Sequence, residues 1–389
     1  MTGSLPLREH GVYVHVPFCR RRCSYCDFYF EIGPTDPRFV DCLIAELQAR
    51  KQELPATPAT LSLGGGTPSR LSSSELQRLV QAVSNTCGLT TDAEVSLEVN
   101  PEDVDDDYVR GLRDAGFTRV SVGLQSFDDD VLGYLGRVHD GARGRAVVES
   151  LVRGGFYVGL DLIVGVPGEG QNRLQRDVDL AASLGAGHVS AYLLTVEEGT
   201  PLVKLIARGA RAAVDDDAQA QAYEGVVDLL RQRGYRQYEI SNHAREGQES
   251  RHNRIYWNRG DYLGLGPGAH SCRVGSDGRV RRRATTARLD GWLSAWQAGH
   301  DAAASEELLD EDAALREGIA FGLRDLITGV DLGALARLHR TRVPEDVKQA
   351  LEAAVARGDA AWGTDGRLRL TGQGARFADR VARDVVRSP

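Results

Sequence analysis

The chain has 389 residues, of which 42% are hydrophobic and 26% charged, so it is long enough for two domains or one large domain with an appendage. This composition excludes global disorder, because it supplies the apolar side chains of a sizeable core. The formal net charge of −8 argues against nucleic acid as a partner.

The first residues, MTGSLPLREHGVYV, lack the basic region followed by a long apolar stretch that marks a secretory signal peptide. No apolar run approaches the length of a membrane span. We therefore expect a cytoplasmic protein without a transmembrane segment.

Short apolar segments alternate with longer amphipathic segments through the first half of the chain. The predicted strands are residues 12–16, 60–63, 95–99, 119–122, 157–164 and 188–193. The predicted helices are residues 39–51, 72–83 (capped by serines), 105–115, 128–135, 143–153 and 174–184. Six strands separated by helices predict an α/β fold: a partial (β/α)6 TIM-like barrel with a parallel sheet. The alternative is an open doubly wound sheet.

The second half of the chain is less regular. Residues 199–217 read as a linker whose acidic end, Asp215-Asp216-Asp217, starts a helix at 218–233. Further predicted elements are an added strand at 238–241, a helix at 306–323, two short helices within 332–358 and a hairpin of 361–362 with 368–370. We divide the chain into a partial barrel (1–210), a barrel extension (211–304) and a small C-terminal helical, winged-helix-like module (305–389) with a packing or lid role.

Polar residues and glycines follow the predicted strands where each strand ends. Cys19 follows the first strand, a triple glycine at 64–66 follows the second, and Glu98 ends the third. Gln125 follows the fourth, and Asp161 lies within the fifth. Parallel strands place ligand sites at their carboxyl ends, so these residues are expected at one rim of the sheet.

The most specific pattern is C-x3-C-x2-C in the run HVPFCRRRCSYCDFYF, formed by Cys19, Cys23 and Cys26. Three thiolates at this spacing can hold three irons of a cubic [4Fe-4S] cluster and leave the fourth iron open. A structural zinc site would need four N/S ligands, and a disulfide framework would need an even number of cysteines and an oxidising compartment. The scattered cysteines, interpreted as ordinary buried or partly buried thiols, are Cys42, Cys87 and Cys272.

This cysteine motif, with an aromatic residue before its last cysteine, resembles the radical S-adenosylmethionine (SAM) superfamily. The resemblance implies that the open iron binds the amino and carboxylate groups of SAM, which the reduced cluster cleaves to a 5′-deoxyadenosyl radical. It also implies a set of SAM-binding positions in this chain. These are Tyr13, Tyr25, Gly65, Gly66, Thr67, Glu98, Gln125, Arg137 and Asp161. Taken singly, each also fits a purely structural role, such as a strand–helix turn at the glycines.

A more specific resemblance, to one family within this superfamily, extends over nearly the whole chain. The segments YVHVPFC, SLGGGTPS, EVNPE, SVGLQSF, DLIVGVPGE, HVSAYLLTVEEGTPL, YEISNHA and GDYLGLGPGAHS resemble the oxygen-independent coproporphyrinogen III oxidase family and its relatives. The dehydrogenases of that family carry another cysteine two residues beyond the motif, where this chain has Phe28, and a longer N-terminal extension. Both departures favour a branch of that family, the HemW heme chaperones.

The run RHNRIYW contains H-N-x-x-Y-W, which resembles the heme-binding motif of those chaperones. The resemblance implies a heme site of His252, Asn253, Tyr256 and Trp257. A neutral imidazole is a normal axial ligand of heme iron, and neighbouring aromatics can pack on the macrocycle. The alternative from residue types alone is a loop histidine beside core aromatics.

Three functions follow as hypotheses. The first is a chaperone that binds the cluster, SAM and heme and delivers heme to recipient hemoproteins, without coproporphyrinogen III oxidase activity. The second is a dehydrogenase that converts coproporphyrinogen III to protoporphyrinogen IX. The third is a radical methylase or cyclopropanase that uses two SAM molecules. Phe28 and the heme motif favour the first. No residue is assigned a catalytic role, and a homodimer is one candidate assembly.

Overall fold

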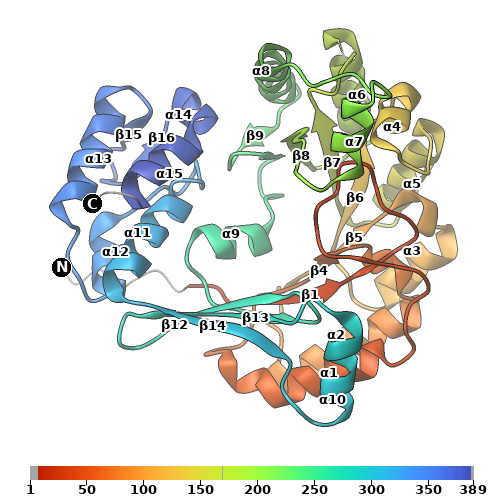
Figure 1. Cartoon of the computed structure of the whole chain (residues 1–389), viewed down its shortest axis with the longest axis horizontal. Coiled ribbons are helices and arrows are strands. Elements are labelled where there is room, and N and C mark those ends of the chain that lie inside the picture. Colours follow the sequence, from red (N-terminus) through yellow and green to blue (C-terminus); the bar gives the residue numbers. More distant parts are fainter. Residues whose placement is uncertain (1–7, 169, 387–389) are drawn as a thin grey trace.

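The computed structural model describes residues 8–168 and 170–386. Its centre is a run of parallel strands, which form a curved sheet (Figure 1). These strands are β1 (Gly11–Val16), β4 (Thr60–Gly65), β5 (Glu94–Val99), β6 (Arg119–Gln125), β7 (Tyr157–Val164) and β8 (His188–Leu193). All six predicted strands are present, neighbours in the chain are neighbours in the sheet, and the partial-barrel fold is confirmed.

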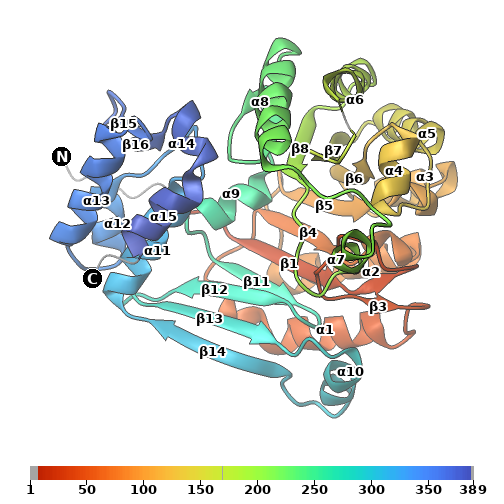
Figure 2. The same cartoon turned by 45° about the horizontal axis from the view of Figure 1, so that its top comes forward.

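Helices cover the outer face of this curved sheet (Figure 2). They are α1 (Phe39–Arg50), α2 (Ser73–Cys87), α3 (Asp106–Asp114), α4 (Asp129–Leu135), α5 (Gly141–Arg153), α6 (Gln171–Ser183) and α8 (Asp216–Gln232). Three short 3₁₀ turns lie at Lys51–Glu53, Pro68–Arg70 and Pro101–Asp103. The predicted serine cap is confirmed: the Ser72 hydroxyl accepts from the backbone N–H of Glu75, whose carboxylate accepts from the Ser72 N–H in return.

The strand residues alternate between the two faces of the sheet. Leu61 and Leu63 of β4 are fully buried against the outer helices and belong to the main hydrophobic core, whereas Ser62 between them faces the interior. Burying such a leucine contributes about 1.5–3 kcal/mol. The interior side carries small and polar residues instead, which leaves space for a ligand.

Antiparallel strands extend the sheet at both edges. They are β9 (Arg236–Gln237) and β10 (Asn242–Ala244) beyond β8, and β11 (Tyr262–Leu265), β12 (His270–Val274), β13 (Val280–Thr285) and β14 (Ala303–Leu309) beyond β1, where β11 itself pairs with β1 in parallel. The predicted strand at 238–241 is wrong. The N–H of Tyr238 donates to the carbonyl of Asn242, so this segment is the turn that reverses the chain between β9 and β10.

Two further predictions fail in part. The helix predicted at 306–323 begins later, as α11 (Glu311–Gly322), because its first residues pair with β13, where Arg282 lies opposite Glu307. Such cross-strand pairs of opposite charge stabilise a strand, which the helical pattern of the sequence conceals. The predicted linker at 199–217 contains α7 (Pro201–Ala207), which packs its Leu202 into a small cluster with α4. Asp215 does cap α8, accepting from the Ala218 N–H.

The C-terminal residues form a module with its own hydrophobic core, set apart from the barrel in Figures 1 and 2. After α10 (Leu289–Gln297) and α11 come α12 (Leu332–Leu338), α13 (Glu345–Ala356), the predicted hairpin of β15 (Ala360–Trp362) and β16 (Leu368–Leu370), α14 (Gly372–Arg376) and α15 (Ala378–Val386). Between module and barrel lies α9 (Arg251–Trp257). The division into three parts remains a prediction. Among the described residues, no helix is long and apolar enough to cross a membrane.

Candidate cofactor site

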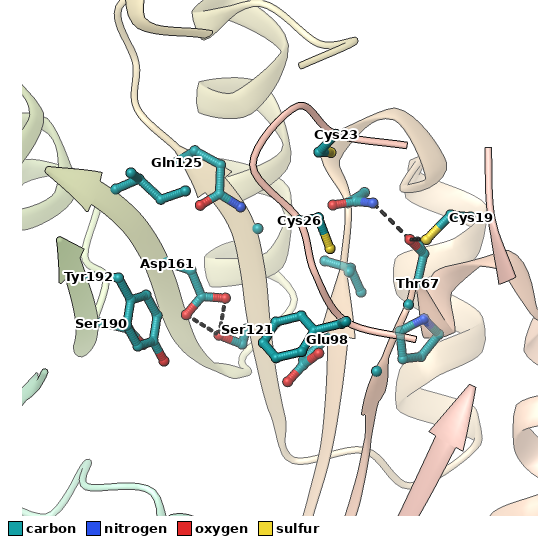
Figure 3. A pocket seen from close by; sticks show the side chains of 18 of the residues that line it. Cys19, Cys23, Cys26, Thr67, Glu98, Ser121, Gln125, Asp161, Ser190 and Tyr192 are labelled. Atoms are coloured by element: carbon teal, nitrogen blue, oxygen red, sulfur yellow. Dashed lines mark hydrogen bonds between the residues drawn. The ribbon is translucent and has the colours of Figure 1, made fainter. Parts of the chain in front are cut away.

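The carboxyl ends of the parallel strands open into a cavity of about 550 Å³, seen from close by in Figure 3. Its wall takes residues from the cysteine segment and from β4, β5, β6, β7 and β8. Parallel sheets place ligands at this edge because the strand ends and their loops converge there. The volume lies in the range of pockets that hold cofactor-sized molecules.

Three thiols lie at one end of this cavity. β2 (Phe18–Cys19) pairs in parallel with β3 (Glu31–Ile32), and Cys23 and Cys26 lie on the connection between them. All three thiols are free, half-buried and part of the cavity wall, and Figure 3 shows them around one region. The cysteines outside the wall are Cys42, Cys87 and Cys272.

A chain of hydrogen bonds joins two of these thiols. The Asn100 amide donates to the Thr67 hydroxyl at 3.0 Å, so the hydroxyl proton is free to point to the Cys19 sulfur, 3.4 Å away. The Asn100 carbonyl oxygen accepts from Arg137 at 2.6 Å, and the other end of that guanidinium donates to the Cys23 sulfur at 3.3 Å. Burial alone would lower the pKa of Arg137, but Tyr25 and Cys23 beside it raise it.

The thiol set fits a [4Fe-4S] cluster. Within residues 8–168 and 170–386, no three His, Cys, Asp or Glu side chains are grouped closely enough to hold a single metal ion. A cubic cluster presents its irons at separate corners, so thiols can bind it at a wider spacing. Burial raises the pKa of the Cys19 and Cys26 thiols, and bound iron stabilises the thiolate form that burial disfavours. Hydrogen bonds to Cys19 and Cys23 are of the kind that surround cluster sulfurs.

The chain packs so closely against itself at the end of β4 that the triple glycine there is required. Gly65 has φ +112°, and a Cβ there would lie 2.8 Å from the His15 ring. A Cβ on Gly66 would lie 2.6 Å from the Pro17 carbonyl oxygen. Both glycines nevertheless line the cavity, and the Gly65 N–H is hydrogen-bonded to Glu98. The turn therefore has a structural reason for its glycines and exposes backbone to a ligand as well.

Two carboxylates stand on neighbouring parts of the interior wall. Glu98 is open to the cavity but surrounded by protein, and this desolvation, followed by repulsion from Asp161, raises its pKa to about 8. Desolvation also raises the pKa of Asp161, against the hydrogen bonds from Ser121 and Ser190. The Ser121 hydroxyl lies 3.2–3.3 Å from both carboxylate oxygens of Asp161 (Figure 3). Such a pair can accept hydrogen bonds from the amine and hydroxyl groups of a ligand.

Gln125 reaches the cavity from a strained turn at the end of β6. Its φ is +67°, a left-handed value that is unusual for a residue other than glycine. Asp177 of α6 holds the turn from behind, because its carboxylate accepts from the Ser126 hydroxyl at 2.5 Å and from the Phe127 N–H at 3.0 Å. Desolvation raises the pKa of Asp177 to about 6.

The two tyrosines predicted to bind SAM lie in different places. Tyr25 lines the cavity beside Arg137, near the cysteines. Tyr13 is not part of the cavity wall. Its ring stacks on His252 with ring centroids 6.2 Å apart, and its hydroxyl lies 3.5 Å from His15 Nδ1.

The predicted heme residues lie on α9, which closes the opposite end of the barrel interior. Glu94 at the start of β5 accepts from the His252 N–H at 3.0 Å. The His252 side chain is buried, with Nδ1 2.6 Å from the Thr60 hydroxyl and Nε2 2.8 Å from the Tyr256 hydroxyl. Burial lowers the pKa of His252 to about 3, so the ring is neutral.

The other two members of the motif face different cavities. Asn253 lines the barrel cavity at its far end, whereas Trp257 lines a second cavity on the other side of α9. The structure therefore keeps His252 and Tyr256 together and separates Asn253 from Trp257.

Several wall residues were not singled out from the sequence. They are Ser62, Ser96, Asn100, Ser121, Ser190 and Tyr192. Most occupy every second position of a strand whose other positions are apolar, and that alternation is the signal that could have found them. Asn100 lies within the quoted EVNPE segment, next to the strand end.

Comparison with known proteins places these features in a family. Residues 13–181 match the radical SAM superfamily model. The chain is 40% identical to heme chaperone HemW of Mycobacterium tuberculosis (strain H37Rv), over 98% of this chain and 96% of the relative. It is 36% identical to the mitochondrial radical S-adenosyl methionine domain-containing protein 1 of Bos taurus, over 81% of this chain and 73% of the relative.

Among solved structures, coproporphyrinogen III oxidase (HemN) of Escherichia coli superposes with a TM-score of 0.80, covering 98% of this chain and 90% of that chain. At 20% identity this likeness shows the shared fold alone. The identity to the mycobacterial chaperone, by contrast, runs through both the barrel and the C-terminal module. The chain therefore belongs to the HemW family of radical SAM proteins.

Proposed function

We propose that this protein is a cytoplasmic heme chaperone that binds one [4Fe-4S] cluster, SAM and heme and delivers heme to recipient hemoproteins. The observation that carries the proposal is the 40% identity to a protein named heme chaperone HemW over 98% of the chain. Membership of the radical SAM superfamily implies the cluster and SAM. Three crowded free thiols also favour a reducing compartment.

In this proposal Cys19, Cys23 and Cys26 hold the cluster, which supplies an open iron for SAM and an electron when reduced. The chain's own contribution is orientation. Glu98 and Asp161 offer acceptors to the polar groups of SAM, and the fixed turn at Gln125 brings an amide to the same cavity. The remaining proposed SAM contacts are Tyr25, Gly65, Gly66, Thr67 and Arg137, with Tyr13 farther along the interior.

Heme binding by His252 is supported by the chemistry of its ring. The imidazole is neutral, and its Nδ1 has a hydroxyl partner in Thr60, of the kind that orients a metal-binding histidine. Its Nε2 contacts Tyr256, so we propose that the Tyr256 hydroxyl moves away when iron binds. Asn253 and Trp257 complete the proposed heme contacts.

The dehydrogenase alternative would need a group at the cavity mouth that Phe28 does not supply. Phe28 lines the cavity and is 70% exposed, and its ring cannot donate or accept a proton as a thiol can. The methylase or cyclopropanase alternative would need room for a second SAM molecule. A homodimer remains a prediction.

The deciding experiment uses protein reconstituted anaerobically with iron and sulfide. We expect heme to bind with a Soret band and to pass to an apo-hemoprotein. Incubation with coproporphyrinogen III, SAM and a reductant should leave the substrate unchanged. Formation of protoporphyrinogen IX would establish the dehydrogenase reading instead, and product methylation of an added tetrapyrrole would establish the methylase reading.

A further inference from the structure

A second cavity, of about 450 Å³, lies on the side of α9 that faces away from the barrel. Its walls come from the residues before β1, from α9 and the turn after it, from α11 and α12, and from the segment between those helices. Figure 2 shows α9 between the barrel and the C-terminal module, so this cavity is a cleft between the two. The cluster and SAM residues proposed above do not line it.

The floor of the cleft is apolar. Ile255 and Trp257 line it from α9, and Leu335 lines it from α12. On α11 it is bounded by Gly318 and Gly322, which are one helical turn apart. A Cβ on Gly322 would lie 2.8 Å from the Val330 side chain, so the wall is tightly packed there. An apolar body suits such a surface better than a highly polar one.

Five arginines line the cleft, although the whole chain carries a net charge of −8: Arg8, Arg251, Arg254, Arg259 and Arg367. Four of them form ion pairs: Arg8 with Asp261, Arg251 with Glu9 and Asp92, Arg254 with Asp325, and Arg259 with Glu317. Arg367 is the exception among the described residues, so its charge is available to a carboxylate of an apolar ligand.

Hydrogen-bond donors in the cleft wall that lack an acceptor also favour a ligand with carboxylates. Arg259 is only 4% exposed, and one of its terminal nitrogens pairs with Glu317 at 2.8 Å, but its Nε and the other terminal nitrogen have no hydrogen-bond acceptor among the described residues. The indole N–H of Trp257 also lacks one. A buried donor without an acceptor is unfavourable, so a ligand that supplies an acceptor is stabilised there. The Arg367 guanidinium contacts the Gly329 carbonyl, at 3.4 Å, and forms no ion pair with the described residues.

We propose that this cleft is the docking site of the tetrapyrrole, with the macrocycle on the Trp257 floor and its carboxylates on Arg367 and the unpaired nitrogens of Arg259. The inference rests on the proposed heme function and adds to it a location that does not depend on iron. Apolar and ionic contacts of this kind should hold an iron-free porphyrin as well as heme. Because His252 is not part of the cleft wall, heme in the cleft is not ligated by it, and the cleft is a second docking position on the protein.

The test is a titration of protoporphyrin IX and heme into the full-length protein. Arg367→Glu reverses one rim charge, and Ala334→Trp fills the cleft from α12. The matched control is Arg342→Glu, an exposed arginine of the same module outside the cleft. Both cleft variants should weaken protoporphyrin binding about tenfold or more, whereas Arg342→Glu should leave it within about twofold.

The outcomes separate the two proposals. Absence of heme and porphyrin binding by the unsubstituted protein would overturn both. Heme binding that is unchanged in Arg367→Glu and in Ala334→Trp would overturn the cleft and leave the chaperone proposal standing. Displacement of protoporphyrin IX by an equal concentration of ATP would identify a nucleotide site and would also overturn this inference.

Discussion

The sulfurs of Cys19 and Cys23 are the two ends of one hydrogen-bond chain. Thr67 contacts the first sulfur and Arg137 the second, and the single side chain of Asn100 joins them, donating to Thr67 and accepting from Arg137. Asn100 follows β5, so a residue that touches neither thiol fixes the donors to both.

Replacing Asn100 by alanine should therefore lower the reduction potential of the bound cluster. Hydrogen bonds to cluster sulfurs stabilise the reduced, more negative state, and this variant loosens two of them. A potentiometric titration followed by electron paramagnetic resonance measures the shift. Asn258→Ala, at the exposed end of α9, is the control. An unaltered reduction potential in Asn100→Ala would show that this hydrogen-bond chain does not influence the cluster.

Cys23→Ala should lose the four-iron cluster, because it removes one of the three thiols in the cavity wall. Cys87→Ala, which removes a half-buried thiol outside that wall, should keep it. Iron content and visible absorbance after anaerobic reconstitution measure both. A full complement of four irons in Cys23→Ala would contradict the ligand assignment.

Glu98→Ala and Asp161→Ala should each weaken SAM binding about tenfold or more, since each removes a carboxylate acceptor from the cavity wall. Calorimetry on the cluster-loaded protein is the measurement. Glu352→Ala, which removes an exposed carboxylate of α13, should bind SAM as the unsubstituted protein does. Equal affinities in all three variants would place SAM elsewhere.

Asp177 should make the protein less stable as the pH rises from about 4 to 6. Its pKa is about 6 in the folded state and about 3.9 in an unfolded chain, so the folded state binds more protons in that window. The loss is on the order of 2–3 kcal/mol in the free energy of unfolding. Urea unfolding across this range should show the slope, and Asp177→Asn should remove it. Asp179→Asn, on the same helix, should retain it.

Tyr256→Phe should strengthen heme binding, because it releases the Nε2 atom of His252 from its hydroxyl partner. His252→Ala should shift or weaken the Soret band. Tyr134→Phe, which removes a hydroxyl from α4, is the control. Identical heme spectra in Tyr256→Phe and His252→Ala would exclude His252 as the iron ligand.

The sequence alone determined the barrel. Six apolar segments spaced by amphipathic ones predicted six parallel strands, and all six are present. The C-x3-C-x2-C spacing is a local pattern, so it needed no tertiary information to indicate a cluster. Predictions of short elements were wrong where the local sequence pattern and the strand pairing favour different structures. Residues 306–309 have the pattern of a helix start, yet they pair with β13, where Arg282 and Arg283 lie opposite Glu307 and Glu306.

Only the tertiary structure decided which side chains share a site. It joined Asn100 to Arg137 across 37 positions, and it put His252 against Thr60 across 192 positions. Such contacts depend on the curvature of the sheet and on the closing position of α9, which no local pattern encodes. The same packing separated Asn253 from Trp257: the two are four positions apart and lie on one face of α9, yet they line different cavities. The cleft beside the C-terminal module exists only because two distant parts of the chain meet there.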